Sequence, residues 1–205
     1  MKRIINFLIR VIVYIPLLVV FPVIVVGRKN IRRKGRVILC CNHQSNGDPI
    51  VIWQRLFRRR FNIMAKDKLF KNKFVSFFIK CFGGYPVNRG TTDITAIKKT
   101  IGLLKKDKAV CIFPEGTRLK TEETNELKSG TVIFALKTNS PIVPAMFVKK
   151  IRPFTFNKLR IGKEFDLAKE IGYNAGDKIT LEIIDEGLKV LHNKMFELIE
   201  EKKRK

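Results

Sequence analysis

Histidine is scarce in this chain, which contains only two, at positions 43 and 192. The four cysteines (Cys40, Cys41, Cys81 and Cys111) include no C-x-x-C pair, and no group of Cys and His residues has the spacing of zinc ligands. We therefore expect no structural zinc site. Because all four cysteines lie in or beside apolar runs, we expect buried, reduced thiols and a cytosolic environment.

Acidic residues are also few, 18 against 42 Lys and Arg, which leaves a formal net charge of +24. Such a surplus predicts a polyanionic partner: nucleic acid, an anionic membrane surface, a phosphorylated substrate or an acidic carrier protein. With 205 residues, 45% of them hydrophobic and 16 of them Phe, the chain is large and apolar enough for one folded domain rather than a disordered one.

Charge is absent from residues 11–26. Extended back to Ile4, this apolar stretch is long enough to cross a bilayer as a helix, which takes about 20 residues. Pro16 and Pro22 also fit a kinked helix that lies within one leaflet. A buried core helix is the third alternative.

No small-residue cleavage site follows the apolar stretch, which disfavours a cleaved signal peptide. Six cations follow it instead: Arg28, Lys29, Arg32, Arg33, Lys34 and Arg36. They indicate that the next domain is held on the cytoplasmic face of the membrane and contacts anionic lipid. The predicted organisation is a membrane anchor over residues 1–27 and one domain over residues 28–205.

Short apolar runs alternate with helical patterns after the anchor, which is typical of an α/β domain. We predict strands at residues 36–41, 61–65, 84–88, 109–113, 141–148 and 157–162. We predict helices at residues 92–104, 129–137 and 177–201, the first of them capped by Thr91 or Thr92.

The first predicted strand is followed by residues 42–48, Asn-His-Gln-Ser-Asn-Gly-Asp, and then by Pro49. Asn-Gly favours a tight turn, and Pro49 is typical of a helix start with Asp48 as its N-cap. The turn brings the Asp48 carboxylate to Nδ1 of His43, which leaves Nε2 able to take a proton from a substrate hydroxyl. The alternative is a structural hydrogen-bonded pair.

Two more polar loops follow predicted strands, at the sheet edge where open α/β proteins bind ligands. Arg89, in the loop at residues 83–90, is suited to a bidentate phosphate contact, although an exposed arginine is often only solvated. Residues 113–118, Phe-Pro-Glu-Gly-Thr-Arg, place Glu115 and Arg118 where they can hold a polar headgroup. The alternative is a Glu–Arg pair that only shapes the loop.

In their order and spacing these blocks resemble the glycerolipid acyltransferase family, and within it the bacterial 1-acylglycerol-3-phosphate acyltransferases. The family's Asn-His-x-Ser-x-x-Asp block is matched within residues 42–48, and its Phe-Pro-Glu-Gly-Thr-Arg block is matched throughout residues 113–118. Shorter matches are residues 65–70, Pro86, Val87, Arg89, Val143, Pro144, Lys128 and Gly130.

The resemblance implies a single mixed β-sheet flanked by helices, behind the N-terminal anchor. It also implies transfer of a fatty acyl group from a thioester to the sn-2 hydroxyl of lysophosphatidic acid, giving phosphatidic acid for phospholipid biosynthesis. His43 would be the general base, oriented by Asp48, with no covalent acyl-enzyme. Substrate-binding roles are implied for Lys66, Arg89, Glu115, Gly116, Thr117 and Arg118.

This chemistry requires no metal and no cofactor, since the acyl donor is a co-substrate, either acyl carrier protein or coenzyme A thioester. Backbone N–H groups near residues 42–48 would stabilise the oxyanion formed during attack. The sequence contains no G-x-S-x-G motif, so a serine nucleophile is not indicated.

Three alternatives remain. The acceptor is glycerol 3-phosphate or another lysophospholipid in the first. Cys41 or Ser45 forms a covalent acyl-enzyme in the second. The third is a membrane-tethered module that binds anionic lipid or nucleic acid. Because that module leaves His43, Asp48 and Glu115 without a role, we expect an anionic membrane surface, and not nucleic acid, as the partner.

Overall fold

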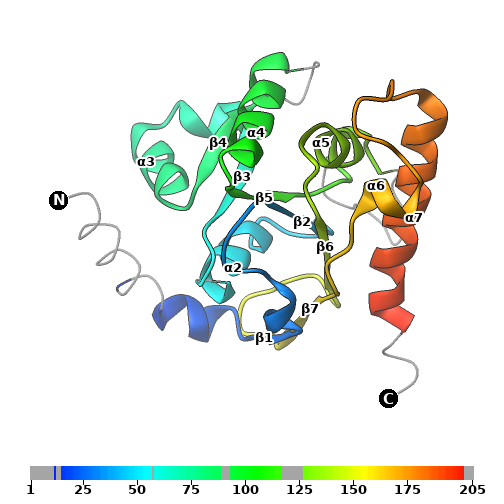
Figure 1. Ribbon diagram of the computed structural model, residues 1–205. Helices are drawn as coiled ribbons and strands as arrows, with labels where there is room; N and C mark the ends of the chain where they lie inside the picture. The colour runs from blue at the N-terminus through cyan, green and yellow to red at the C-terminus, as the bar shows by residue number, and fades with distance from the viewer. Residues whose placement is uncertain (1–11, 13–14, 57, 89–92, 117–126, 201–205) are drawn as a thin grey trace.

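The computed structural model describes residues 12, 15–56, 58–88, 93–116 and 127–200. Within them, seven strands form one sheet in the order β1-β7-β6-β2-β5-β3-β4 (Figure 1). The strands are β1 Val23–Val26, β2 Val37–Cys41, β3 Phe61–Lys66, β4 Gly84–Val87, β5 Ala109–Ile112, β6 Ile142–Phe147 and β7 Asn157–Ile161. The α-helices are α2 Asp48–Arg55, α3 Lys73–Cys81, α4 Ile94–Lys105, α5 Gly130–Thr138, α6 Leu167–Glu170 and α7 Leu181–Glu200. Two 3-10 helices are η1 Arg28–Asn30 and η2 Asp67–Phe70.

The sheet is mixed. Strand β2 runs parallel to its two neighbours, β5 and β6, whereas β6 and β7 pair antiparallel. All five residues of β2 are buried, because a central parallel strand is covered on both faces. The predicted α/β class with one mixed sheet flanked by helices is confirmed, and each of the six predicted strands is present.

Alternate residues of the central strands supply two separate cores. Leu39 and Cys41 pack in the cluster that includes the apolar side chains of α2, on one face of the sheet. Ile38 and Cys40 pack in a second cluster with α4, α5 and α7, on the other face. Figure 1 shows α2 separated from α5 and α7 by the sheet. The period-2 alternation of a strand produces this three-layer arrangement.

The N-terminal segment differs from the predicted anchor. Residues 15–20 are helical, but Val23–Val26 form strand β1, which pairs in parallel with β7. The predicted apolar helix is therefore wrong at its C-terminal end. Four consecutive β-branched residues after Pro22 favour a strand, and an apolar count alone does not separate the two states. In the described part of the chain, we find no helix of the length and apolarity needed to span a bilayer.

Two predicted helix caps are also corrected. The N-cap of α2 is Gly47, so Asp48 is the first residue of the helix instead of its cap. The N-cap of α4 is Asp93, whose side chain accepts a hydrogen bond from the Ala96 N–H, in place of Thr91 or Thr92. Asp93 also accepts the Asn88 N–H, so its carboxylate connects the end of β4 to the start of α4.

Candidate active site

The loops that carry the predicted site residues leave the same edge of the sheet. Strands β2, β5, β3 and β4 are mutually parallel neighbours, so their carboxyl ends meet at one edge. His43 follows β2 and Glu115 follows β5, and the two are joined directly by a hydrogen bond. Lys66 ends β3 and is paired in register with Val87 at the end of β4. The topology thus brings distant blocks of sequence together.

His43 and Asp48 form the predicted pair. Nδ1 of His43 lies 2.9 Å from Oδ2 of Asp48, and the imidazole is 6% exposed. The ring also stacks on Phe113, with centroids 4.3 Å apart. In the part of the chain that the structure covers, Nε2 of His43 has no hydrogen-bond partner. The arrangement leaves that nitrogen available for a proton.

Asp48 is fully buried, and four donors converge on its carboxylate. Oδ2 accepts the backbone N–H groups of Gln44 and Ser45, at 2.7 and 2.8 Å, as well as His43. Oδ1 accepts the Ser45 hydroxyl at 3.0 Å. Because an acceptor of this kind requires a hydrogen on the facing ring nitrogen, the tautomer that fits the contact has its proton on Nδ1 and its lone pair on Nε2.

Five backbone N–H groups of this loop already have hydrogen-bond acceptors. The N–H groups of residues 43, 44, 45 and 47 donate to Glu115, Asp48, Asp48 and Ser45 respectively. The Asp48 N–H donates to the Ser45 carbonyl. These five groups hold the loop in shape, and stabilisation of the oxyanion by other N–H groups near residues 42–48 stays a prediction.

Asn42 attaches the same loop to the sheet. Its side-chain amide donates to the Phe147 carbonyl at 3.1 Å and accepts the Phe147 N–H at 2.8 Å. This two-way pairing lets a buried side chain act as a further rung between the ends of β2 and β6. The sequence identified Asn42 only as part of a matching block. Its contacts show that it joins the loop to the end of β6.

Glu115 accepts a hydrogen bond from the backbone of the loop that carries His43. Its Oε2 accepts the His43 N–H at 3.0 Å. Burial raises the pKa of Glu115 to about 7, with a smaller upward contribution from the charge of Asp48, while the hydrogen bond from His43 acts in the opposite direction. The sequence predicted a substrate contact for Glu115, and the structure adds a contact with the backbone of the block at residues 42–48.

Gly116 and Lys128 meet beside Glu115. Gly116 has a φ of +67°, and a Cβ added to it would lie 2.6 Å from Cε of Lys128. The lysine stem therefore crosses the glycine, and only glycine fits both the backbone angle and the contact. The sequence matched Lys128 to the family pattern but predicted no role for it. Its approach to Gly116 is a tertiary contact that sequence spacing does not reveal.

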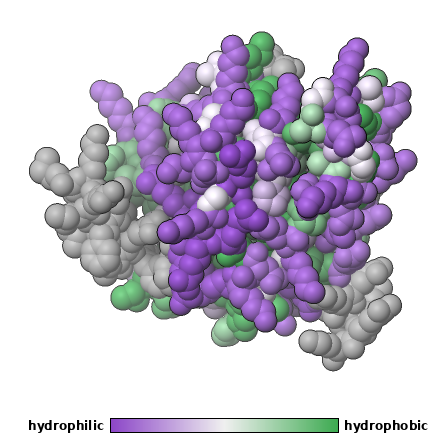
Figure 2. All heavy atoms as spheres, viewed as in Figure 1, coloured by the Kyte–Doolittle hydropathy of each residue, from purple (hydrophilic) through white to green (hydrophobic). Residues whose placement is uncertain are grey.

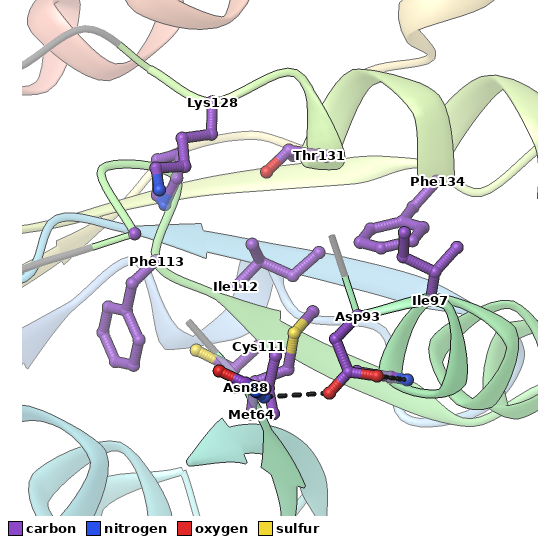
Figure 3. A pocket seen from close by; sticks show the side chains of 15 residues that line it. Met64, Asn88, Asp93, Ile97, Cys111, Ile112, Phe113, Lys128, Thr131 and Phe134 are labelled. Carbon is purple, nitrogen blue, oxygen red and sulfur yellow. Dashed lines mark hydrogen bonds between the residues drawn. The ribbon is translucent and has the colours of Figure 1, made fainter. Parts of the chain in front are cut away.

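A pocket of about 220 Å³ adjoins these residues (Figure 3). Lys128 and Phe113 lie at one side of it, and Ile97 and Phe134 lie at the other. Its walls are mainly apolar and come from β3, β5, α4 and α5. Phe113 belongs to both the pocket wall and the stack on His43, so the pocket and the histidine share a boundary.

Three predicted binding residues, Arg89, Thr117 and Arg118, lie outside the described residues. Of the two nucleophile alternatives, Cys41 is fully buried, and burial raises the pKa of its thiol well above the usual value. The Ser45 hydroxyl is engaged with Asp48 and with the Gly47 N–H. Neither side chain is prepared for attack. Among the residues described, no three His, Cys, Asp or Glu side chains are grouped to hold a metal.

Comparison with known proteins supports the resemblance found in the sequence blocks. The 1-acyl-sn-glycerol-3-phosphate acyltransferase of Bacillus subtilis is 30% identical over 181 residues, which cover 85% of this chain and 90% of that protein. The protein of the same name from Borreliella burgdorferi is 36% identical over 124 residues, 60% of this chain and 49% of that protein.

The fold has a counterpart among solved structures. The crystal structure of the 1-acyl-sn-glycerophosphate (LPA) acyltransferase PlsC from Thermotoga maritima superposes with a TM-score of 0.64 and 21% identity, covering 97% of this chain and 98% of that one. Residues 22–148 match the family described as Acyltransferase, and this range includes both sequence blocks. The chain therefore belongs to the acyltransferase family and is an enzyme of the O-acyltransferase class.

Proposed function

We propose that this enzyme transfers a fatty acyl group from a thioester to the sn-2 hydroxyl of 1-acylglycerol 3-phosphate, giving phosphatidic acid. The observation that carries the proposal is the 2.9 Å contact between Nδ1 of His43 and Asp48, at a sheet edge beside an apolar pocket. The names of the relatives support the choice of acceptor. Glycerol 3-phosphate and other lysophospholipids are the competing acceptors.

The reaction proceeds in two proton transfers. Nε2 of His43 removes the proton from the acceptor hydroxyl as its oxygen bonds to the thioester carbonyl carbon. The tetrahedral intermediate then collapses, the carbon–sulfur bond breaks, and the departing thiolate takes the proton from the imidazolium. Asp48 keeps the ring in one orientation and stabilises its positive charge. The histidine ends in its starting state, and no acyl-enzyme forms.

Direct transfer is favoured over a covalent intermediate because neither candidate nucleophile is suitably placed. The Cys41 thiol is buried within the sheet core, and its raised pKa keeps it protonated. Ser45 uses its hydroxyl to bond Asp48, so ionising it would place negative charge against a carboxylate.

Substrate binding is assigned to residues of the blocks that resemble the family. We assign the acceptor phosphate to Lys66 and Arg89, and its glycerol and phosphate to Glu115, Gly116, Thr117 and Arg118. The geometry supports an added part for Lys128, which reaches the pocket over Gly116. The mainly apolar pocket wall suits a hydrocarbon chain.

The apolar N-terminal segment supports a location at the membrane. We propose that residues before Pro22 anchor the enzyme and that the cations at residues 28–36 keep the domain on the cytoplasmic face. Lysophosphatidic acid and phosphatidic acid are both lipids, so such an anchor places the site where acceptor and product reside. The basic surface suits either anionic donor, acyl carrier protein or coenzyme A thioester.

The test is an acyl-transfer assay of the full-length enzyme in membranes, with defined acceptors and labelled acyl donors. His43→Ala should lower kcat by a factor of about 10²–10⁴, the usual contribution of a general base. Cys41→Ala is the matched control, because it truncates a neighbouring side chain outside the proposed chemistry. A fully active His43→Ala enzyme would refute the mechanism, and preference for glycerol 3-phosphate would refute the acceptor.

A further inference from the structure

The segment of η2 and α3 exposes large apolar side chains on a surface that is otherwise mainly hydrophilic. Leu69, Phe74 and Phe77 are 47%, 72% and 49% exposed. Figure 2 shows one face of the molecule, where hydrophilic side chains predominate and hydrophobic ones emerge in separate patches. Exposed phenylalanines on consecutive turns of one helix are a cluster, unlike a single apolar residue on a surface.

The inner face of α3 already supplies its packing on the domain. Ile79 lies against Gly84, so closely that a Cβ on the glycine would be 2.2 Å from Cγ2 of the isoleucine. Phe82, just after the helix, packs on Trp53 with ring centroids 4.2 Å apart. The helix therefore carries apolar side chains both where it packs on the domain and where it faces outwards. The outward ones are not needed for that packing.

Cations alternate with the exposed apolar side chains along this segment. Five exposed lysines lie in the same stretch: Lys66, Lys68, Lys71, Lys73 and Lys80. Asp67 is the one acidic residue between positions 66 and 80. Among the described residues, none of these lysines forms a salt bridge. Exposed phenylalanines in one segment with lysines that form no salt bridge match the interface of an anionic bilayer, with an apolar interior beneath a layer of negative headgroups.

The position of this segment links it to the active site. Strand β3 ends at Lys66, η2 begins at the next residue, and α3 follows it. η2 therefore leaves the carboxyl edge of the sheet, the edge that also carries His43, and α3 runs from there back to the start of β4, where Ile79 meets Gly84. Figure 1 shows α3 beside the β3–β4 side of the sheet, with α7 on the other side of the molecule.

We infer that η2 and α3 form a lipid-docking surface that inserts Leu69, Phe74 and Phe77 into the interface of an anionic bilayer. The lysines of the same segment bind the headgroups. The surface turns the carboxyl edge of the sheet towards the membrane, which an N-terminal tether alone does not do. This inference stands apart from the proposed reaction, because lipid contact at α3 is measured without any turnover.

The first experiment places a fluorescent reporter on the surface. Trp53 is the single native tryptophan and is buried, so Phe74→Trp adds one exposed indole whose emission is read after that of the parent protein is subtracted. Leu181→Trp is the matched control, since Leu181 is 76% exposed and begins α7. Full-length protein is mixed with vesicles of phosphatidylcholine and phosphatidylglycerol that carry spin-labelled lipid. Emission at position 74 should shift to the blue and be quenched, while emission at position 181 should not change.

The second experiment tests the charge. The triple variant Lys68→Gln, Lys71→Gln, Lys73→Gln should bind phosphatidylglycerol vesicles more weakly, by about fivefold for each lysine removed. The control is Lys105→Gln, Lys106→Gln, Lys108→Gln, which changes the net charge equally with exposed lysines before β5, at the opposite edge of the sheet. Vesicles of phosphatidylcholine alone should bind both variants alike.

Three outcomes would overturn the inference. Equal quenching at positions 74 and 181, or equal losses in the two lysine variants, would leave α3 no special contact with lipid. A blue-shifted indole at position 74 in the absence of vesicles, with emission that depends on protein concentration, would show that a second copy of the chain covers the surface instead. Loss of acyl transfer with normal quenching at position 74 would count against the reaction and leave the docking surface intact.

Discussion

The loop at residues 42–48 and the segment at Lys128 flank the same site and are built in opposite ways. In the loop, His43, Ser45 and Asp48 bond one another, and Glu115 holds the backbone. Lys128 lies over Gly116, and no carboxylate of the described residues lies within ion-pair distance of it. The groups proposed to move protons are thus fixed in advance, while a cation that faces the pocket is left for a ligand.

Disrupting the hydrogen-bonded loop at residues 42–48 should have the largest effect on activity. Asp48→Asn replaces an acceptor of four hydrogen bonds by an amide that donates with one of its two ends, so the tautomer of His43 is no longer set. We expect kcat to fall about 10³-fold with little change in either KM. Steady-state kinetics measures this, with circular dichroism to verify folding.

Asp107→Asn is the control for that variant, because Asp107 is an exposed aspartate paired with Arg36 far from the pocket. Its φ of 54° suits asparagine as well as aspartate. A large rise in KM with unchanged kcat in Asp48→Asn would mean that Asp48 serves binding, and the contrast between the two sides of the site would fail.

Glu115 sharpens the comparison through its ionisation. Its pKa rises from 4.5 to about 7 on folding, so the folded state holds the proton more tightly than the unfolded chain does. The resulting stabilisation is complete below the unfolded pKa and is lost as the pH rises through about 7. Glu115→Gln lacks this contribution. The difference in unfolding free energy between the two proteins should therefore change by about 2 kcal/mol between about pH 4.5 and about pH 8, allowing for solvent screening.

Denaturant titrations of both proteins across that range measure the difference. Parallel curves would contradict the raised pKa. Activity supplies a second readout: the carboxamide oxygen introduced by Glu115→Gln still accepts the His43 N–H, so this variant should retain most of its kcat, whereas Glu115→Ala should lose about tenfold. Equal losses in the two variants would mean that the negative charge, and not the hydrogen bond, is what the site requires.

The sequence predicted the strands well because each one is a short apolar run bounded by turn residues. It also predicted the His43–Asp48 contact, since a turn of fixed length joins the two residues. It failed at β1, because the same run of valines suits a membrane helix or a strand and only pairing with β7 decides between them.

Contacts between distant blocks of the sequence could not be predicted for a different reason. The hydrogen bond of Glu115 to His43 and the crossing of Lys128 over Gly116 depend on the order of strands in the sheet. No local pattern encodes that order. The acceptors of the N–H groups at residues 43–45 could not be predicted for the same reason, because they include a side chain from another loop.

Substitution of Lys128 should have the smallest effect, and it should change KM instead of kcat. Lys128→Gln removes a charge that faces the pocket and keeps a side chain of similar reach over Gly116. We expect the KM for lysophosphatidic acid to rise about tenfold, with kcat and the KM for the acyl donor nearly unchanged. Lys105→Gln, at the far edge of the sheet, controls for the loss of net charge. If the KM for the acyl donor rises instead, Lys128 binds the donor. If kcat alone falls, the cation acts on the reacting atoms, as the loop at residues 42–48 is proposed to do.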